Sequence, residues 1–261
     1  MAIEHVTILG AGNLGSQLGR AMADEGFRID QVFSRTIEKA RPLAQALEAG
    51  YTTLLPEIRS GADLYILAVR DDAIETVARA LARHLPASSL VAHTSGARES
   101  HLLAPYFDRY GVFYPLQTLS VGRQVPMNEV PFCICANKGE DETLLLQAAN
   151  RLSASVHRIG DADRAYLHLA AVFSNNFPNH LYDIAYRLLE YRGLDFNLLR
   201  PLITETAAKV MYGKPAELQT GPAIRADKST LDIHLKLLDD YPAIRELYLQ
   251  LTRSISPNLK I

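Results

Sequence analysis

The sequence predicts an α/β protein in which a doubly wound, mostly parallel sheet is followed by an all-helical region. Up to about residue 155, short β-rich apolar runs alternate with amphipathic helical stretches, which is typical of a parallel sheet covered on both faces. A glycine-rich turn directly follows the first apolar run, and beyond about residue 160 the strand pattern ends. We therefore expect a nucleotide-type domain over residues 1–155 and an all-helical domain over residues 156–261.

Seven segments of the first domain have the features of strands. They are short, apolar and rich in β-branched or aromatic residues, and turn-forming residues bound most of them. Helices are expected between several of them, at residues 13–25, 36–49, 72–84 and 140–152. The expected strands are HVTILG, RIDQVFS, DLYILAV, SLVAHTS, YGVFYP, PFCICA and, as a possible last one, ASVHRI.

The second domain is expected to contain one long helix and three shorter ones. The long helix would begin near Asp161 and end at Gly193, because acidic residues favour helix starts and glycine favours helix ends. Pro178 should bend it, since proline has no N–H to donate to the carbonyl of Ser174. The shorter helices are expected near residues 195–212, 224–238 and 241–254.

Composition and charge narrow the range of partners. The net charge is −2 without blocks of like charge, so we expect neither a nucleic-acid partner nor an anionic membrane. No apolar run approaches the roughly 18 residues of a membrane span, and no signal-type segment opens the sequence, so a cytoplasmic location is expected. The 8 histidines and 2 cysteines have no metal-ligand spacing, so we expect no metal.

The stretch GAGNLG places three glycines between the first strand and the first helix. This is the context that the dinucleotide-binding G-x-G-x-x-G motif requires. Gly10 would permit the tight turn, Gly12 would let a pyrophosphate approach the backbone, and Gly15 would let helix and strand pack closely. The pyrophosphate would lie on the free N–H groups of the first helical turn, beside Asn13 and Leu14. An ordinary turn is the alternative.

The end of the second strand favours NADP(H) over NAD(H). Asp30 has nearly the spacing of the acidic residue that binds an NAD ribose, but it lies at the wrong end of the strand. The carboxyl end carries Ser34, Arg35 and Thr36 instead. Two hydroxyls and a guanidinium suit a 2′-phosphate through charge-assisted hydrogen bonds. Ser34 or Thr36 could also cap the next helix, and both roles can hold together.

Further candidate residues follow the later strands, at the sheet edge where open α/β proteins bind ligands. Val69 and Arg70 should lie near the cofactor ribose and pyrophosphate, while Asp72 is expected to cap the next helix. Thr94 and Ser95 would approach the nicotinamide, although a turn rich in serine and threonine is often only a turn.

The two segments that supply these candidates contain more polar side chains. His93 precedes the first pair and is expected to be a hydrogen-bonded core histidine. Tyr114 stands at the end of the next strand and is a candidate cofactor contact, and Gln117 is a candidate substrate contact.

A polar stripe is expected on the long helix. His168, Asn175, Asn179 and Tyr182 fall within roughly 60° of one another at 100° per residue, and their apolar neighbours indicate a buried helix. Because unpaired buried polar groups cost about 1–3 kcal/mol each, the stripe should face a ligand, another segment or water. We expect His168 and Asn175 nearest the site, with Asn179 as a substrate contact. Arg225 could bind a substrate carboxylate or form a surface ion pair.

The chain resembles a group of reductases that includes the 6-phosphogluconate and β-hydroxyacid dehydrogenases, pyrroline-5-carboxylate reductase and F420-dependent NADP reductase. Within this group it looks most like a bacterial family that joins a Rossmann-like domain to a helical domain of unknown function. The resemblance extends over essentially the whole chain and is specific for the family. The segments that carry it are GAGNLG, HTSGA, FYPLQT, HLAAVFSNNFPNHLY and QTGPAIRAD.

The resemblance implies an NADP-binding first domain, a helical domain that dimerises and an active site between them. In β-hydroxyacid dehydrogenases a catalytic lysine stands four residues before an asparagine on the first interdomain helix. Here Ala171 and Val172 stand four residues before Asn175 and Asn176, and the nearby potential cation is His168. The lysine mechanism is therefore not favoured, whereas C=N reduction of the pyrroline-5-carboxylate reductase type stays open.

Two functions follow from these patterns. The first is an NADP(H)-dependent oxidoreductase that reduces a small carbonyl or imine substrate. His168 would donate the proton, because histidine exchanges protons near neutral pH, and Asn175 and Ser95 would assist it. The second is a dimeric protein that binds NADP(H) as a sensor or interaction partner without catalysis.

Overall fold

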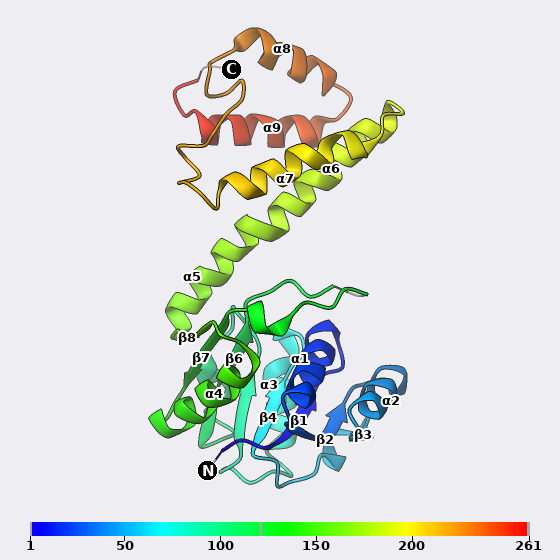
Figure 1. Ribbon diagram of the computed structural model, residues 1–261, viewed down its shortest axis with the longest axis vertical. Helices are drawn as coiled ribbons and strands as arrows, with labels where there is room; N and C mark the ends of the chain where they lie inside the picture. Colours follow the sequence, from blue (N-terminus) through cyan, green and yellow to red (C-terminus); the bar gives the residue numbers. More distant parts are fainter. Residues whose placement is uncertain (1, 121, 260–261) are drawn as a thin grey trace. The chain divides into compact units, whose positions relative to one another are not determined.

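The computed structural model describes residues 2–120 and 122–259. The chain divides into two compact units, Met1–Asn176 and Phe177–Ile261. The first unit contains a sheet with helices on both of its faces, whereas the second is built from helices in the part that the structure describes (Figure 1).

In the described part of the first unit, eight strands form a single sheet in the order β3-β2-β1-β4-β5-β6-β7-β8. Neighbouring strands are parallel except β6 and β7, which pair antiparallel. The prediction of a mostly parallel, doubly wound sheet is confirmed. The strands are β1 (His5–Leu9), β2 (Arg28–Phe33), β3 (Gly50–Thr52), β4 (Leu64–Leu67), β5 (Leu90–His93), β6 (Arg109–Pro115), β7 (Phe132–Ala136) and β8 (Val156–Arg158).

Helices cover both faces of this sheet. On one face α1, α2 and α4 bury Leu18, Leu43 and Leu145 against the strands. On the other face α3 buries Val77 and Leu81 in a separate cluster. These helices are α1 (Asn13–Asp24), α2 (Ile37–Ala46), α3 (Ile74–Leu81) and α4 (Gly139–Leu152).

The register of the parallel strands brings several turns to one edge of the sheet. Leu9 pairs with Leu67, Leu67 pairs with His93, and His93 pairs with Val112. The carboxyl ends of β1, β4 and β5 are therefore level with one another, and β6 continues past them to Pro115. The turns after these strands contain most of the residues that are predicted from the sequence to bind the cofactor. This edge of the sheet is therefore the candidate site.

Two local details differ from the sequence-based expectation. Strand β3 is only three residues long, too short for its alternation pattern to be recognised, and was not predicted. Asp72 does not cap α3, whose N-cap is Ala73. The Asp72 carboxylate instead accepts two hydrogen bonds from the Arg70 guanidinium, at 3.2 and 2.9 Å.

The expected single helix from Asp161 is interrupted. Helix α5 (Asp161–Ala171) passes into a π turn at Val172–Asn176, and α6 (Phe177–Tyr191) follows. The wider turn lies immediately before Pro178, whose ring would clash with the carbonyl four residues earlier in a regular α-helix. The irregularity expected from Pro178 is therefore present as a π turn.

The two units divide after residue 176 rather than after residue 155. The reason is visible in the first turn of α5. Arg164 is 0% exposed, and Asp161 accepts hydrogen bonds from the backbone and side chain of Ser100. These contacts fix α5 to the sheet domain, although its amino-acid pattern alone resembles that of the helices that follow.

The second unit buries few apolar side chains. Its buried hydrophobic residues among those described are Ile184, Ala223, Leu231, Leu238 and Leu249. Large apolar side chains remain exposed on the same helices. The helices are α6, α7 (Arg200–Lys209), α8 (Lys228–Leu237) and α9 (Pro242–Ile255).

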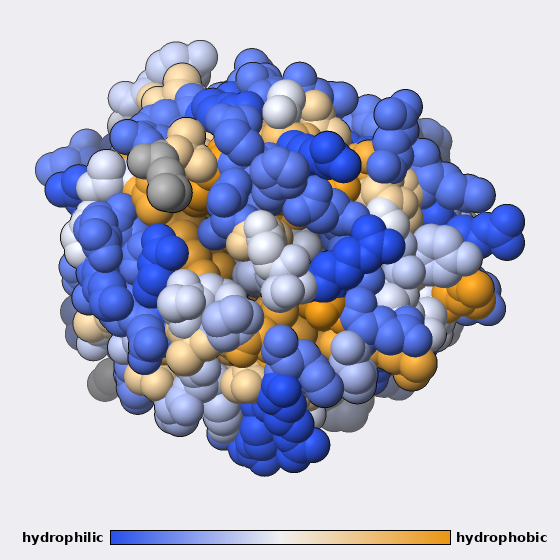
Figure 2. All heavy atoms as spheres, turned by 90° about the horizontal axis from the view of Figure 1, so that it is seen from below, coloured by the Kyte–Doolittle hydropathy of each residue, from blue (hydrophilic) through white to orange (hydrophobic). Residues whose placement is uncertain are grey.

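Figure 2 shows one face of the first unit. Viewed from below, its face is dominated by hydrophilic side chains, with apolar atoms visible between them in small areas (Figure 2). Among the residues that the structure describes, no helix combines the length and the apolar character needed to cross a bilayer.

Candidate functional site

The glycine-rich turn after β1 has no room for side chains at two of its three glycines. Gly10 has a φ of +121°, and a Cβ added there would lie 2.2 Å from the carbonyl oxygen of Ala68. A Cβ at Gly15 would lie 1.8 Å from the carbonyl oxygen of Gly10. Gly12 differs, because nothing lies within 4 Å of the corresponding position. Two glycines thus close the turn, and the third leaves open space above it.

That open space faces the start of helix α1. Gly12 is the N-cap, no side chain caps the helix, and the first turn holds no acidic residue. The N–H groups at the start of α1 are thus available to an external anion, and the helix dipole favours one there. The side chain of Asn13 is already engaged, since its amide donates to the carbonyl of Leu119 at 3.0 Å. The cradle fits a dinucleotide pyrophosphate.

The residues after β2 present a cation and hydroxyls at the same edge. Ser34 is buried, and Arg35 and Thr36 are exposed. Thr36 is the N-cap of α2 but makes no capping hydrogen bond with its side chain, so its hydroxyl is not used for that purpose. Asp30 lies nearer the other end of β2, where His5 contacts it at 3.0 Å. This arrangement fits a 2′-phosphate better than a ribose held by Asp30.

The turns after β4 and β5 are tightly organised. Val69 is half-buried, and the guanidinium of Arg70 is held by Asp72. Thr94 is buried and donates its hydroxyl hydrogen to the carbonyl of Leu67 at 3.3 Å. The hydroxyl oxygen of Ser95 accepts hydrogen bonds from the two backbone N–H groups that follow Gly96, at 3.2 and 3.0 Å. Ser95 therefore shapes its own loop.

A pocket of about 360 Å³ opens beside the end of β6 and contains four of the predicted site residues. These are Tyr114, Gln117, His168 and Asn175. The pocket belongs wholly to the first unit, because α5 and the π turn form one of its walls. Its full lining is Tyr114, Leu116, Gln117, Thr118, His168, Ala171, Ser174, Asn175 and Asn176.

Tyr114 and His168 form a hydrogen-bonded pair in this pocket. The phenolic oxygen of Tyr114 lies 3.1 Å from Nδ1 of His168, and the two rings meet edge to face. Burial raises the pKa of Tyr114 to about 12, so its hydroxyl keeps its proton at neutral pH. Gly96 makes the approach possible, since a Cβ there would lie 2.6 Å from Nδ1 of His168.

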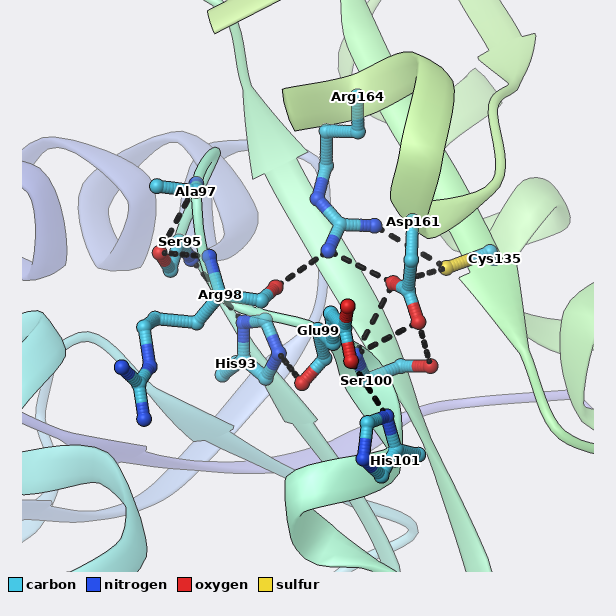
Figure 3. Close-up of polar contacts among 10 residues, drawn as sticks. All are labelled: His93, Ser95, Ala97, Arg98, Glu99, Ser100, His101, Cys135, Asp161 and Arg164. Carbon is cyan, nitrogen blue, oxygen red and sulfur yellow. Dashed lines mark hydrogen bonds and ion pairs between the residues drawn. The ribbon is translucent and has the colours of Figure 1, made fainter. Parts of the chain in front are cut away.

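The buried guanidinium of Arg164 attaches the helix that carries His168 to the loop after β5 (Figure 3). Arg164 donates to the backbone carbonyl of Arg98, contacts Asp161 at 2.7 Å and donates to the sulfur of Cys135 at 3.4 Å. Asp161 in turn accepts hydrogen bonds from the N–H and hydroxyl of Ser100. The first turn of α5 is thereby attached to the loop after β5. His168 lies one helical turn beyond Arg164, on the same side of α5.

The buried groups around Arg164 have shifted pKa values. Burial opposes the ionisation of Asp161, but hydrogen bonds from Ser100 and Arg164 outweigh it and lower the pKa of this carboxyl. Burial raises the pKa of Cys135 to about 11, so its thiol stays protonated. Burial, reinforced by the charge of Arg164, lowers the pKa of His93 to about 4.

His93 is a hydrogen-bonded core histidine, as the sequence predicts. Its side chain is 0% exposed. Nδ1 accepts from the backbone N–H of Ser95 at 3.2 Å, and Nε2 lies 3.3 Å from the carbonyl of Glu99. Because Nδ1 is an acceptor and the ring is neutral, Nε2 carries the proton and donates it to that carbonyl.

Two predicted substrate contacts lie outside this pocket. Asn179 is exposed on α6, and Arg225 is exposed in the loop before α8, so both belong to the second unit. The stripe expected along one helix is divided by the π turn after His168. Its apolar neighbours are not uniformly buried either, since Leu169 is 51% exposed.

Three residues that matter to this site were not predicted to take part. Arg164 and Asp161 are three residues apart at the start of a helix, where an acid–arginine pair is usually solvent-exposed. Gly96 follows Thr94 and Ser95 in a turn that was expected at the carboxyl edge of the sheet, but nothing local in the sequence indicates that it lies against the His168 ring.

The sequence was compared with known families and structures. The family described as "NADP oxidoreductase coenzyme F420-dependent" matches residues 5–96, and the domain of unknown function DUF2520 matches residues 130–255. A Bacteroides fragilis protein assigned as an NADP oxidoreductase has a crystal structure with 42% sequence identity and a TM-score of 0.93. The match covers 98% of this chain and 99% of that protein. The chain belongs to this NADP oxidoreductase family.

Two more distant structures share the family's fold. A Thermotoga maritima protein is 20% identical over 95% of this chain and 99% of its own, with a TM-score of 0.75. The Myxococcus stipitatus imine reductase in complex with NADP⁺ is 15% identical over 98% of this chain and 95% of its own, with a TM-score of 0.66. No curated protein matches the chain significantly. Family membership confirms the predicted NADP-binding domain and the class of cofactor.

The neutral, buried state of His93 leads to a pH-dependent stability. The unfolded chain takes up a proton on this histidine near pH 6.5, whereas the folded protein resists protonation until about pH 4. Stability should therefore be intact above pH 6.5 and fall on the order of 3 kcal/mol as the pH drops to 4. Urea unfolding at several pH values measures this loss. In His93→Asn the slope should be smaller, and an unchanged slope would contradict the assignment.

Proposed function

We propose that the protein is an NADPH-dependent reductase of a small carbonyl or imine compound that binds in the pocket beside β6. The observation that carries this proposal is the Tyr114–His168 hydrogen bond, which lies in a pocket at the edge of the sheet that also carries the glycine-rich turn. A proton donor and a dinucleotide cradle at one edge are what a hydride-transfer reaction needs from the protein.

The cofactor-binding part rests on the turns after β1 and β2. The N–H groups around Gly12 and Leu14 would hold the pyrophosphate, and Ser34, Arg35 and Thr36 would hold the 2′-phosphate. Val69, Arg70 and Thr94 would border the ribose and nicotinamide, with Ser95 keeping the loop in shape. When bound, the reduced nicotinamide supplies a hydride. All other contributions to the reaction come from side chains and backbone groups of the protein.

The proton is supplied along a short path. Tyr114 is 8% exposed and cannot exchange readily with solvent, whereas His168 is half-buried. His168 would therefore collect a proton from water and pass it from Nδ1 to the phenolic oxygen of Tyr114. Tyr114 would donate its own proton to the substrate atom that becomes negative as hydride arrives. Gln117 and Asn175 would orient the substrate by hydrogen bonds.

One observation favours a second candidate function. Ala171 lines the pocket and stands four residues before Asn175, which is the spacing at which β-hydroxyacid dehydrogenases carry the catalytic lysine. A chain that kept the cofactor cradle but lost the catalytic cation would serve as a dimeric NADP(H) sensor or interaction protein. Tight NADPH binding without turnover of any carbonyl or imine compound would favour this alternative.

We also propose that the chain forms a homodimer through its helical unit. Tyr212 is 89% exposed, Met211 is 79% exposed and Leu237 is 70% exposed, whereas the unit buries few apolar side chains of its own. Leu237 is on α8, and Met211 and Tyr212 lie in the turn after α7. Exposed apolar side chains of this extent are typical of an interaction site. A second copy of the chain is the simplest partner for it.

The cofactor cradle is tested by two substitutions. Gly12→Ala meets no atom within 4 Å, so the fold should be kept, while the added methyl would occupy the space of the pyrophosphate. NADPH affinity should fall at least about tenfold in a nicotinamide fluorescence titration. Arg35→Ala should weaken NADPH by about 10- to 100-fold and leave NADH unchanged. Wild-type affinities in both variants would place the cofactor elsewhere.

The proton path is tested by removing its members singly and together. Tyr114→Phe and His168→Ala should each lower kcat about 100-fold while the Kd for NADPH stays the same. Because the two groups act in series, the double variant should be little slower than either single one. Additive losses, or an unchanged kcat in either single variant, would show that the two residues do not form one path.

The dimer is tested by its mass in solution. Light scattering during gel filtration should give the mass of two chains. Leu237→Glu should shift the population towards single chains, because a carboxylate would be buried at the interface. Lys228→Glu, at an exposed polar position on the same helix, is the matched control and should leave the dimer intact. A monomeric wild type would refute the proposal.

A further inference from the structure

The pocket beside β6 carries an inference about its substrate. We propose that it selects uncharged aldehydes and ketones bearing hydroxyl or amide groups, and discriminates against keto acids and cyclic imines. This inference rests on the proposed reductase function and deepens it by choosing between the carbonyl and imine substrates that the sequence left open.

The lining of the pocket is polar but contains no acidic side chain, lysine or arginine. The polar groups are the amides of Gln117, Asn175 and Asn176 and the hydroxyls of Tyr114, Thr118 and Ser174, together with the His168 imidazole. Amides and hydroxyls both donate and accept hydrogen bonds, so they match a ligand that does both.

The nearest buried charges are directed elsewhere. Arg164 is 0% exposed, and its guanidinium is directed towards Asp161, Cys135 and the carbonyl of Arg98 (Figure 3). The Asp161 carboxylate is occupied by Arg164 and Ser100. Neither charge can pair with a ligand in the pocket. A keto acid would therefore lose hydration from its carboxylate without gaining a cation in exchange.

The pocket also lacks an anion for a cationic substrate. A C=N bond is reduced as its iminium cation, which aliphatic cyclic imines form in water near neutral pH, so the pocket would have to stabilise a positive charge. The lining holds no carboxylate, and burial, which raises the pKa of Tyr114 to about 12, keeps that hydroxyl neutral. An alkoxide is a much stronger base than a phenolate, so the same Tyr114 hydroxyl protonates it readily.

The amide side chains of the pocket account for the preference for hydroxylated compounds. Three amides in one pocket each lose contact with water when a substrate enters. A ligand that lacks hydrogen-bonding groups would leave them unpaired, and sites built on such groups strongly reject analogues that lack the matching hydroxyl. A hydroxyl next to the carbonyl would pair with Asn175 or Gln117 and restore these bonds.

The reaction balances with the groups already named. Hydride from NADPH forms a C–H bond at the carbonyl carbon, and the C=O π electrons move to oxygen. That oxygen takes the proton of the Tyr114 hydroxyl, and the Tyr114 oxygen regains a proton through His168 from water. The carbonyl compound is reduced to an alcohol, and NADPH is oxidised to NADP⁺.

The experiment compares small probes of matched size on the whole protein. Hydroxyacetone and glyceraldehyde represent uncharged hydroxycarbonyl compounds, pyruvate represents keto acids, and 2-methyl-1-pyrroline represents cyclic imines. Two quantities are measured for each probe. The first is kcat/KM from the rate of NADPH oxidation, and the second is the Kd with which the probe binds the protein–NADPH complex, from the change in nicotinamide fluorescence. Hydroxyacetone or glyceraldehyde should exceed pyruvate and the imine in kcat/KM by at least about tenfold.

Variants of the lining test the cause of this preference. Gln117→Lys should raise kcat/KM for pyruvate relative to hydroxyacetone at least about tenfold, by supplying the missing cation. Gln124→Lys is the matched control, because Gln124 is exposed on the same loop and does not line the pocket, and it should change neither ratio. Asn175→Asp should raise kcat/KM for the imine relative to kcat/KM for hydroxyacetone, since it supplies an anion of nearly the same shape as the amide.

The outcomes separate this inference from the proposed function. If no probe is reduced but hydroxyacetone binds the NADPH complex more tightly than pyruvate and the imine do, the reductase function fails and the selectivity stands. If pyruvate or the imine equals or exceeds the uncharged probes in kcat/KM, the inference is overturned although the protein is a reductase. Equal Kd values for all probes, or no detectable binding of any, also overturn it.

Discussion

The buried guanidinium of Arg164 is the interaction on which the arrangement of this site depends. A cation without solvent exposure is tolerated when its charge is compensated, and here Asp161 compensates the charge while Asp161, the carbonyl of Arg98 and the sulfur of Cys135 accept from the two terminal nitrogens, although Nε is left without a partner. Because Asp161 also binds Ser100, the first turn of α5 is fixed to the loop after β5. The position of His168 in the pocket follows from that attachment.

Three segments far apart in the sequence meet at this point, and each brings something different. The loop after β5 contributes Gly96, whose lack of a side chain leaves room for the His168 ring. Strand β6 contributes the Tyr114 hydroxyl, and α5 contributes the His168 imidazole. The lining of the site is polar and contains no aspartate, glutamate, lysine or arginine, and Arg164 and Asp161 pair with each other outside it. This division separates two tasks, since the ion pair supplies rigidity and the neutral groups meet the ligand.

The sequence was most informative where one local pattern determines the result. Alternating apolar strands and helices identified the sheet, and the spacing of Gly10, Gly12 and Gly15 identified the cradle, because both depend on neighbouring residues. Helical spacing placed Asn175 and His168 on one side of the helix, and both line the pocket. The attachment through Arg164 was not predicted, since an acid–arginine pair in a first helical turn gives no sign of burial. The division after residue 176 was missed for the same reason, because long-range contacts determine it.

The antiparallel pairing of β6 with β7 has a consequence for how the chain can be divided. The family matched at residues 130–255 includes β7, α4 and β8, which are edge elements of the sheet, while the family matched at residues 5–96 ends after β5. Strand β6, with Tyr114, lies in neither. Cutting the chain at the borders of these family matches would split one hydrogen-bonded sheet. The exposed edge strands would have unpaired backbone groups and would be prone to aggregation. A fragment that keeps this sheet intact must therefore run from β1 through β8, across the borders of both family matches.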